Sequence, residues 1–358
     1  MLSQGGIAPD DADSRTVRQI LALQQIKKSS GLLSGHIVVE LLDIDNLAMT
    51  NLVGKEDVEA IVSHELIGRL MLLAARSPWI APVLSSIMGF EGSEFYFKEW
   101  PELVGSTFGS VCSRFDEAVP VGVKLSNDGS IMINPPDELV LSQGDQVLVL
   151  AEDDDSYTVN DGAPTFSESL LHDRRVEGLE RAQERMLFCG WRRDMADMIM
   201  ELDLDVKPGS ELWLFNTVPV DERAWMLLDA GNKAQLRVKN LRIRHAVGNP
   251  TSRRQLLSLQ EVSDGSDGLE IGARTGHRVV LSYFTSILIL SDSARGDDEQ
   301  DVEASDSRSL ATTLSIQDIQ QASMLRMAAL GKNLELFPPI SEILDTRTAK
   351  QMQLISQG

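Results

Sequence analysis

The turn Gly190-Trp191-Arg192-Arg193 carries the residues with the clearest potential for chemistry in this sequence. It follows a short apolar run, residues 186–189, and precedes a helix that the periodicity predicts from Asp194 onward. The turn therefore lies where the first strand of an α/β unit meets its helix. Backbone N–H groups at such a helix start bind anions, and two arginines would add positive charge. An anion site and a solvated basic turn are both compatible with these residues.

The same turn does not match the phosphate-binding pattern of dinucleotide enzymes. That pattern, G-x-G-x-x-G, needs three glycines, whereas this turn has only Gly190. Trp191 would also obstruct the close approach of a pyrophosphate. Asn216 ends the next predicted strand, where nucleotide-binding proteins place an acidic residue for the ribose, and a turn-forming Asn is the simpler interpretation. We therefore expect no bound nucleotide.

Other motifs give little support for catalysis. His64-Glu65 begins like the zinc-binding helix H-E-x-x-H, but Gly68 stands where the second histidine is required, so we interpret His64 as a helix-surface residue. Four consecutive acids, residues 152–155, follow a predicted strand. They could coordinate a hard cation or form a solvated exit from the strand, and calcium sites usually place their ligands at alternate positions. We expect no catalytic residues and a non-enzymatic function.

Composition limits the partners of the chain. Its 358 residues include 54 acidic and 33 basic side chains, for a net charge of −21, which argues against nucleic acid as a partner and favours attraction of cations. Cys112 and Cys189 form neither a disulfide framework nor a zinc pattern. No secretory signal precedes the first helix, and no apolar run approaches the ~20 residues that a membrane-spanning helix needs. As it stands, the chain is expected to be soluble.

The predicted elements give an α/β fold with a doubly wound, Rossmann-like parallel sheet and a small β-rich lobe. Residues 185–350 alternate β-α-β-α-β-α-β, which predicts a parallel sheet, incomplete and interrupted by an insertion at 260–284 that the fold would not use. The earlier part divides into three segments. These are 1–90, the back end of a first Rossmann-like unit with a helix at 11–28, a strand at 36–42 and crossover helices at 56–75 and 80–88; 91–155, the β-rich lobe; and 156–184, a linker.

An internal repeat links the two α/β blocks. In each copy Asp-Ser-Arg begins a helix, and a strand follows that carries a glutamate and then an aspartate. Two copies of the same helix–strand pair imply two copies of the same α/β unit. The first copy would lack its front half and the second its back lobe. The repeated residues are Asp13-Ser14-Arg15, Glu40 and Asp43 in the first copy, and Asp306-Ser307-Arg308, Glu342 and Asp345 in the second.

Four motifs of this chain resemble the cytosolic part of the plant CASTOR and POLLUX ion channels. The resemblance covers most of residues 11–259 and 285–348. It implies tandem domains of the RCK type, regulators of potassium conductance, which assemble into a gating ring beneath a tetrameric pore. It also implies truncation at both ends, with pore helices outside this sequence. The motifs are Phe188-Cys-Gly-Trp-Arg-Arg-Asp194, Pro208-Gly-Ser-Glu-Leu-Trp213, Asp306-Ser-Arg-Ser-Leu-Ala311 and Val149-Leu-Ala-Glu-Asp-Asp-Asp155.

The resemblance further implies regulation by Ca²⁺. Calcium-sensing RCK proteins use carboxylates at strand ends, and Glu40, Asp292 and Glu342 occupy such positions here. Solvated acids are the alternative interpretation. The leading hypothesis is a ligand-regulated gating-ring module of a cation channel at the nuclear envelope, active in nuclear calcium signalling during root symbiosis and joined to the membrane only through its pore helices. Trp191 and the two arginines would then make an inter-domain or inter-subunit contact.

Two other hypotheses remain open at this point. One is a nucleotide-dependent α/β enzyme or nucleotide-binding protein built on the same sheet, since fold alone does not decide function. The other is a nonfunctional truncated product. Half-domains would expose sheet edges and apolar helix faces, so such a product would aggregate.

Overall fold

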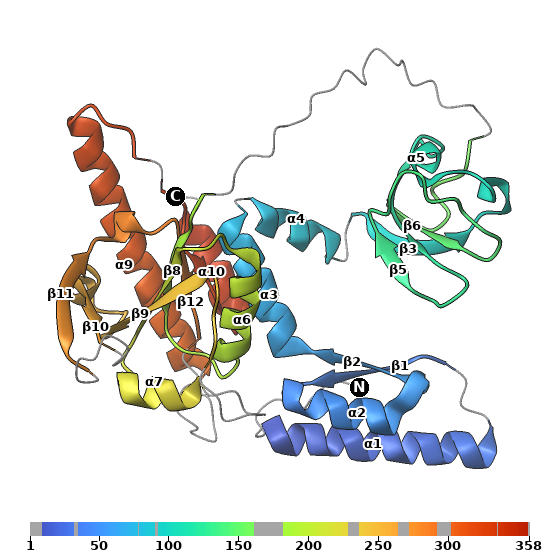
Figure 1. Ribbon diagram of the computed structural model, residues 1–358, viewed down its shortest axis with the longest axis horizontal. Helices are drawn as coiled ribbons and strands as arrows, with labels where there is room; N and C mark the ends of the chain where they lie inside the picture. Colours follow the sequence, from blue (N-terminus) through green and yellow to red (C-terminus); the bar gives the residue numbers. More distant parts are fainter. Residues whose placement is uncertain are drawn as a thin grey trace. The chain divides into compact units, whose positions relative to one another are not determined.

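The computed structural model describes residues 9–31, 35–77, 79–89, 92–160, 182–227, 236–263, 272–291, 302–334 and 336–356. The chain divides into two compact units (Figure 1). The first unit combines Met1–Pro78 with Arg181–Gly358, and the second is Trp79–Glu180. The first repeat copy and the second α/β block therefore belong to one unit, although more than a hundred residues separate them along the chain.

A seven-stranded sheet forms the centre of the first unit, with strand order β11-β10-β9-β8-β7-β12-β13. The five strands from β9 to β13 in that order are parallel, and β10 and β11 are antiparallel to their neighbours. This confirms the predicted α/β fold with a parallel sheet. The strands are β7 (Arg185–Cys189), β8 (Ser210–Asn216), β9 (Leu241–Val247), β10 (Leu259–Val262), β11 (Arg274–Val279), β12 (Ser286–Ile289) and β13 (Ile340–Ser341).

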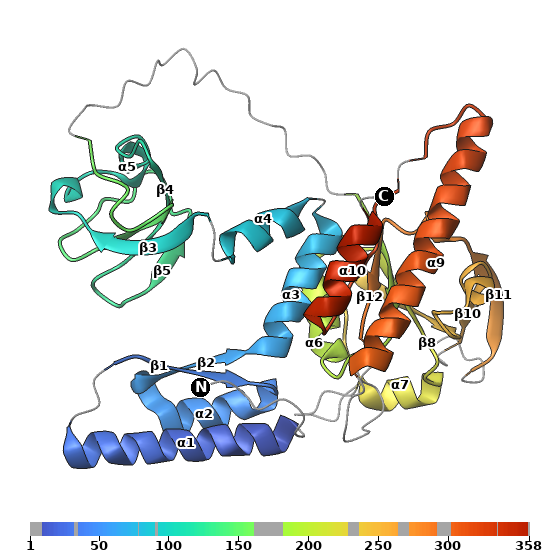
Figure 2. The same cartoon turned by 180° about the vertical axis from the view of Figure 1, so that it is seen from behind.

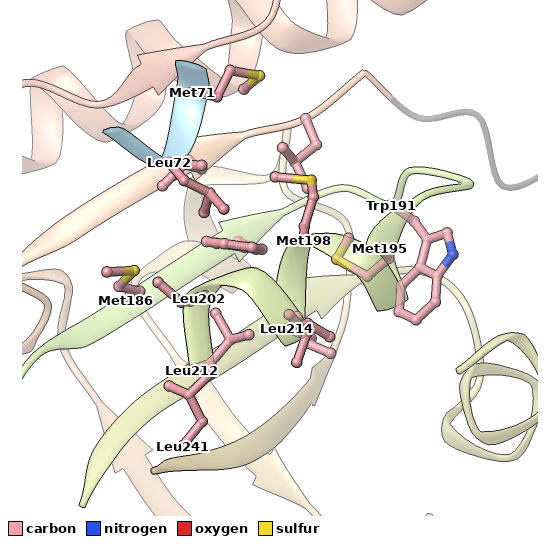
Figure 3. Close-up of a cluster of buried hydrophobic side chains, with 14 of the residues drawn as sticks. Met71, Leu72, Met186, Trp191, Met195, Met198, Leu202, Leu212, Leu214 and Leu241 are labelled. Atoms are coloured by element: carbon pink, nitrogen blue, oxygen red, sulfur yellow. The ribbon is translucent and has the colours of Figure 1, made fainter. Parts of the chain in front are cut away.

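Helices cover both faces of this sheet, which explains the uninterrupted apolar runs of its strands. Met186 and Phe188 of β7 join one core with helix α6 (Met195–Asp205), part of which Figure 3 shows. Leu187 and Cys189 join a second core on the opposite face with α8 (Arg253–Leu256) and α9 (Val302–Ala329). Two further helices, α7 (Val220–Met226) and α10 (Thr346–Ser356), complete this part.

The prediction that residues 260–284 form an insertion outside the fold is wrong. Strand β11 lies within this range and β10 overlaps its start, and both extend the sheet beyond β9 (Figure 1 and Figure 2). Arg244 of β9 forms an ion pair with Glu261 of β10 at 2.5 Å, and Leu281 and Phe284 are buried in the core. The two strands were not predicted because each is short and the segment between them is rich in Gly, Ser and Asp, which is typical of a loop. Residues 264–271 lie outside the described residues.

The first repeat copy contains a strand where the sequence indicated a helix. Strand β1 (Ile37–Leu41) pairs in parallel with β2 (Val58–Val62), and helix α3 (Ser63–Arg76) starts only after β2. The helix predicted over 56–75 is therefore wrong in its first part. Buried Val58 and Val62 alternate with exposed Glu59 and Ile61, a strand pattern that merges with the helical spacing of α3. Helices α1 (Pro9–Ser30) and α2 (Leu47–Gly54) complete this copy.

The hydrogen bonds confirm the internal repeat. Asp13 on α1 accepts the backbone N–H groups of Leu42 (2.9 Å) and Asp43 (3.0 Å), just after β1. Asp306 on α9 accepts those of Leu344 (2.8 Å) and Asp345 (2.9 Å), just after β13. Both aspartates are buried, at 0% and 1% exposure. In each copy a buried carboxylate therefore ties the start of a helix to the exit of the next strand.

The second unit contains an antiparallel four-stranded sheet with order β3-β6-β4-β5. Its own core lies on one face of that sheet and includes Val123, Val147, Phe108 and Val111. A tight turn follows β4, in which Gly129 donates to Leu125 O at 3.0 Å with φ +72°. The elements are α4 (Ile80–Ile87), β3 (Glu94–Glu99), α5 (Phe108–Val111), β4 (Ala118–Lys124), β5 (Ile131–Ile133) and β6 (Gln146–Ala151). Residues 161–181 of the predicted linker lie outside the described residues.

Candidate functional site at the carboxyl edge of the sheet

The carboxyl ends of β7 and β12 meet where the strand order reverses, the usual ligand position in an open α/β sheet. Gly190 forms the turn after β7, with φ +106°. A Cβ atom at this position would lie 2.5 Å from the carbonyl oxygen of Leu290, directly after β12. Only glycine permits this close approach, so Gly190 sets how near the turn lies to the neighbouring strand.

Arg192, in this turn, is the central charged group of the site. Its side chain is 2% exposed and donates to Asp194 through Nε (2.8 Å) and Nη2 (2.7 Å). It also donates to Oε1 of Glu342 at 2.6 Å and to the backbone oxygen of His64 at 2.9 Å. Burial lowers the pKa of Arg192, but the hydrogen bond to Asp194 and the charges of Glu342 and Asp194 raise it further, so the net pKa is raised. The guanidinium is a buried, fully charged group with fixed partners.

Glu342 follows β13 and uses both carboxylate oxygens. Its Oε2 accepts the backbone N–H of Ser291 at 2.8 Å and the Ser291 hydroxyl at 2.7 Å, while Oε1 accepts from Arg192. The side chain is 7% exposed. The carboxylate therefore joins the ends of β12 and β13 to the turn after β7.

Trp191 is a core residue, which fits the inter-domain form of the predicted contact and not the inter-subunit form. Its side chain is 2% exposed and belongs to the same hydrophobic core as Met71 and Leu72 of α3 (Figure 3). Arg192 is buried as well. Arg193 lies at the surface and forms an ion pair with Asp43, which follows β1. All three residues of the turn thus contact other parts of their own unit.

Helix α3 packs along this edge and contacts α6, β12 and β13. Gly68 allows the approach, since a Cβ there would lie 3.3 Å from Met198 Cγ. At its end Arg76 forms ion pairs with Glu184 and Asp205, each at 2.9 Å. The hydrogen bond with Glu184 raises the pKa of Arg76 despite partial burial. Helix α3 is therefore held on the second α/β block by apolar and ionic contacts.

Several acidic side chains lie around Asp197 of α6, and the sequence did not predict that they lie close together. The pKa of Asp197 on α6 is raised, first by burial and then by the nearby charges of Asp194, Asp45, Glu65 and Asp43. These residues come from three separate stretches of the chain. No spacing rule connects them, so the sequence carried no signal for the group.

The three predicted calcium ligands have different positions. Glu342 is engaged with Arg192 and Ser291, and Glu40 accepts a hydrogen bond from Ser63 at 2.5 Å. Asp292 lies outside the described residues. Among the residues that the structure describes, no group of three or more His, Cys, Asp or Glu side chains is placed to hold a metal ion. The calcium site therefore stays a prediction.

Asn216 lies in a turn and His64 lies on the surface of a helix, as the sequence predicted. Asn216 is 1% exposed; its Oδ1 accepts the N–H of Val218 at 2.9 Å, and its Nδ2 donates to Gly190 O at 3.3 Å. It is a turn-forming Asn whose side chain is already used. His64 is exposed on α3, and the acids at 152–155 are exposed after β6.

Comparison with known proteins shows which proteins this chain is similar to. Residues 64–166 match the family model described as "Castor and Pollux, part of voltage-gated ion channel". The chain is 40% identical over 357 residues to the probable ion channel POLLUX of Arabidopsis thaliana, covering 95% of this chain and 40% of that protein. It is 44% identical over 321 residues to the probable ion channel CASTOR of Oryza sativa subsp. japonica, covering 89% of this chain and 32% of that protein. The chain is a relative of the CASTOR and POLLUX ion channels.

This relationship confirms the resemblance inferred from the four motifs. The chain spans 32–40% of the length of the curated relatives that it matches. Among solved structures, the human SLO3 gating ring has the same fold, with a TM-score of 0.50 at 11% identity, covering 83% of this chain and 56% of that chain. The α/β fold of the chain is thus similar to that of this gating ring. In the part of the chain that the structure describes, no helix has the length and apolarity needed to span a membrane.

Proposed function

We propose that this CASTOR/POLLUX relative is a non-enzymatic regulatory module of a cation channel, of the gating-ring type. Two findings support the proposal: similarity to ion channels over 95% of the chain, and the fold shared with a gating ring. In such a module, a ligand biases the ring through its different affinity for two arrangements. Rearranged subunits then pull on pore helices that lie outside this sequence.

The Arg192 network is the observation that supports this function most directly. One guanidinium contacts Glu342 at the carboxyl edge of the sheet and the backbone of α3 at His64. A ligand that changes the partners of Arg192 would therefore change how α3 is held. The nucleotide-enzyme alternative has no comparable support, because Trp191 is buried and Asn216 is fully hydrogen-bonded inward.

Ca²⁺ is the proposed effector, with Glu40, Asp292 and Glu342 as its proposed ligands. The net charge of −21 favours cation binding in general. Because Oε1 of Glu342 accepts from Arg192 and Oε2 accepts from Ser291, a cation bound there would compete with Arg192 for the carboxylate. Cation binding would then be coupled to the release of α3. A location at the nuclear envelope and a role in symbiotic calcium signalling are parts of the same proposal, and they rest on the family resemblance.

Self-association into a tetrameric gating ring is the proposed assembly. Its support is the shared fold with the SLO3 gating ring. Nucleic acid is not a proposed partner, since the charge is strongly negative. Contact with a membrane would occur only through pore helices.

Calorimetric titration of the chain with CaCl₂ and with NAD tests the function, combined with hydrogen exchange of α3. We expect heat from calcium binding, faster exchange in residues 63–76 when calcium is present, and no heat from NAD. Glu342→Gln should weaken calcium binding, while Glu222→Gln, at an exposed glutamate of α7, serves as the matched control. Tight NAD binding without a calcium response would contradict the proposal.

A further inference from the structure

The four-stranded sheet of the second unit has an apolar outer face. Its other face is covered by the core that contains Val123 and Val147 and the short helix α5. Five large apolar side chains on the outer side are 41–73% exposed, which is unusual for neighbouring residues on one sheet face. They are Phe95 (50%) and Phe97 (41%) on β3, Val119 (60%) on β4, and Ile131 (54%) and Ile133 (73%) on β5.

The strand register shows that these side chains form three rows across the face. Paired residues on neighbouring strands point to the same side of a sheet. The rows are Phe95–Leu150–Val119, then Phe97–Leu148–Gly122–Ile133, and then Glu99–Gln146–Lys124–Ile131. Lys124 Nζ lies 6.0 Å from the ring centre of Phe97, which confirms that both side chains occupy the outer face.

We propose that this outer face binds the same face of a second copy of the chain, around a two-fold axis parallel to β6. Such an axis places β3 of one subunit over β4 of the other. Phe97 then lies opposite Gly122 of the partner subunit, a large side chain against a position without one. Phe95 lies opposite Val119 of the partner subunit. Sheets that pack face to face keep their strands within about 30° of each other, so the paired residues remain opposite each other in twisted sheets.

Charge complementarity selects a second copy as the occupant. The polar row carries one acid, Glu99, and one base, Lys124, on the two sides of β6. The two-fold axis brings Glu99 opposite Lys124 of the partner subunit, and the reverse pair forms at the same time. A two-fold interface requires a self-complementary surface, and this face meets that requirement in both size and charge. The inference adds a specific subunit contact to the self-association in the proposed function, on which it rests.

Sedimentation equilibrium of the full chain, measured over a range of concentrations, tests the contact. We expect the wild-type chain to dimerise. Val119→Asp should raise the dimer Kd at least about tenfold, because it places a carboxylate against Phe95 of the partner subunit. Leu204→Asp is the matched control, since Leu204 is 77% exposed on α6 of the first unit and does not belong to the four-stranded sheet.

Charge reversal tests the two-fold geometry itself. Lys124→Glu and Glu99→Lys should each raise the Kd at least about tenfold, since like charges would face each other. The double variant should return it to within about threefold of wild type. A monomeric wild-type chain, an equal effect of Leu204→Asp, or a double variant as weak as the single ones would overturn the proposal.

A calcium titration of Val119→Asp separates this inference from the proposed function. Retained calcium binding with lost dimerisation supports the contact and leaves the effector proposal intact. A chain that dimerises through this face without binding calcium contradicts the effector and supports the contact.

Discussion

Arg192 is the residue whose loss would disturb the candidate site most. It is buried with Glu342, which is 7% exposed. Removing one member of a buried ion pair leaves an uncompensated charge and costs about 3–5 kcal/mol, whereas removing both is often close to neutral. We therefore expect Arg192→Met to lower the free energy of unfolding by about 3–5 kcal/mol. Urea denaturation followed by tryptophan fluorescence measures this change.

The double variant Arg192→Met/Glu342→Gln should recover about half of that loss or more. Glutamine keeps a carbonyl oxygen that can accept from Ser291, so the contact between β12 and β13 persists. Equal losses in the single and double variants would mean that packing of the Arg192 side chain, rather than its charge pair, stabilises the site.

At the scale of elements, α3 decides whether the two α/β blocks act together. Leu72 is 5% exposed in the core with Trp191, while its neighbour Leu73 is 43% exposed on the same helix. Leu72→Ala should therefore destabilise the first unit by about 2–5 kcal/mol and speed hydrogen exchange along α3. Leu73→Ala provides the matched control and should change stability by less than about 1 kcal/mol. Similar exchange in both variants would show that α3 is held by its ion pairs alone.

At the scale of the whole molecule, the two units have separate hydrophobic cores and should unfold in separate steps. Leu214 belongs to a core of the first unit and Leu103 to the core of the second. Calorimetry should therefore show two transitions. Leu103→Ala should lower the transition of the second unit by about 10 °C or more and leave the other in place, and Leu214→Ala should do the reverse. One shared transition that both variants shift would show that the units fold cooperatively.

The sequence alone determined the parallel sheet and the repeat. Strands buried on both faces must be apolar throughout, so residues 186–189 and 286–290 were recognisable without neighbours. The repeated aspartates were recognisable from the sequence. Asp13 and Asp306 each stand near the start of a helix, and each accepts a hydrogen bond from the end of the strand that follows that helix. The similarity to CASTOR and POLLUX ion channels was recognisable from equally local motifs.

Only the tertiary structure decided the role of the turn at Gly190. Trp and Arg are residue types that often form contacts between subunits, and no residue close to Trp191 and Arg192 in the sequence indicates that they are buried. They become buried because α3 supplies His64, 128 positions before Arg192, and β13 supplies Glu342, 150 positions after it. Strand β2 was missed for a related reason, since Val58–Val62 is extended only because β1 pairs with it. Local patterns report which faces of a segment are apolar, whereas the partners that cover those faces come from distant parts of the chain.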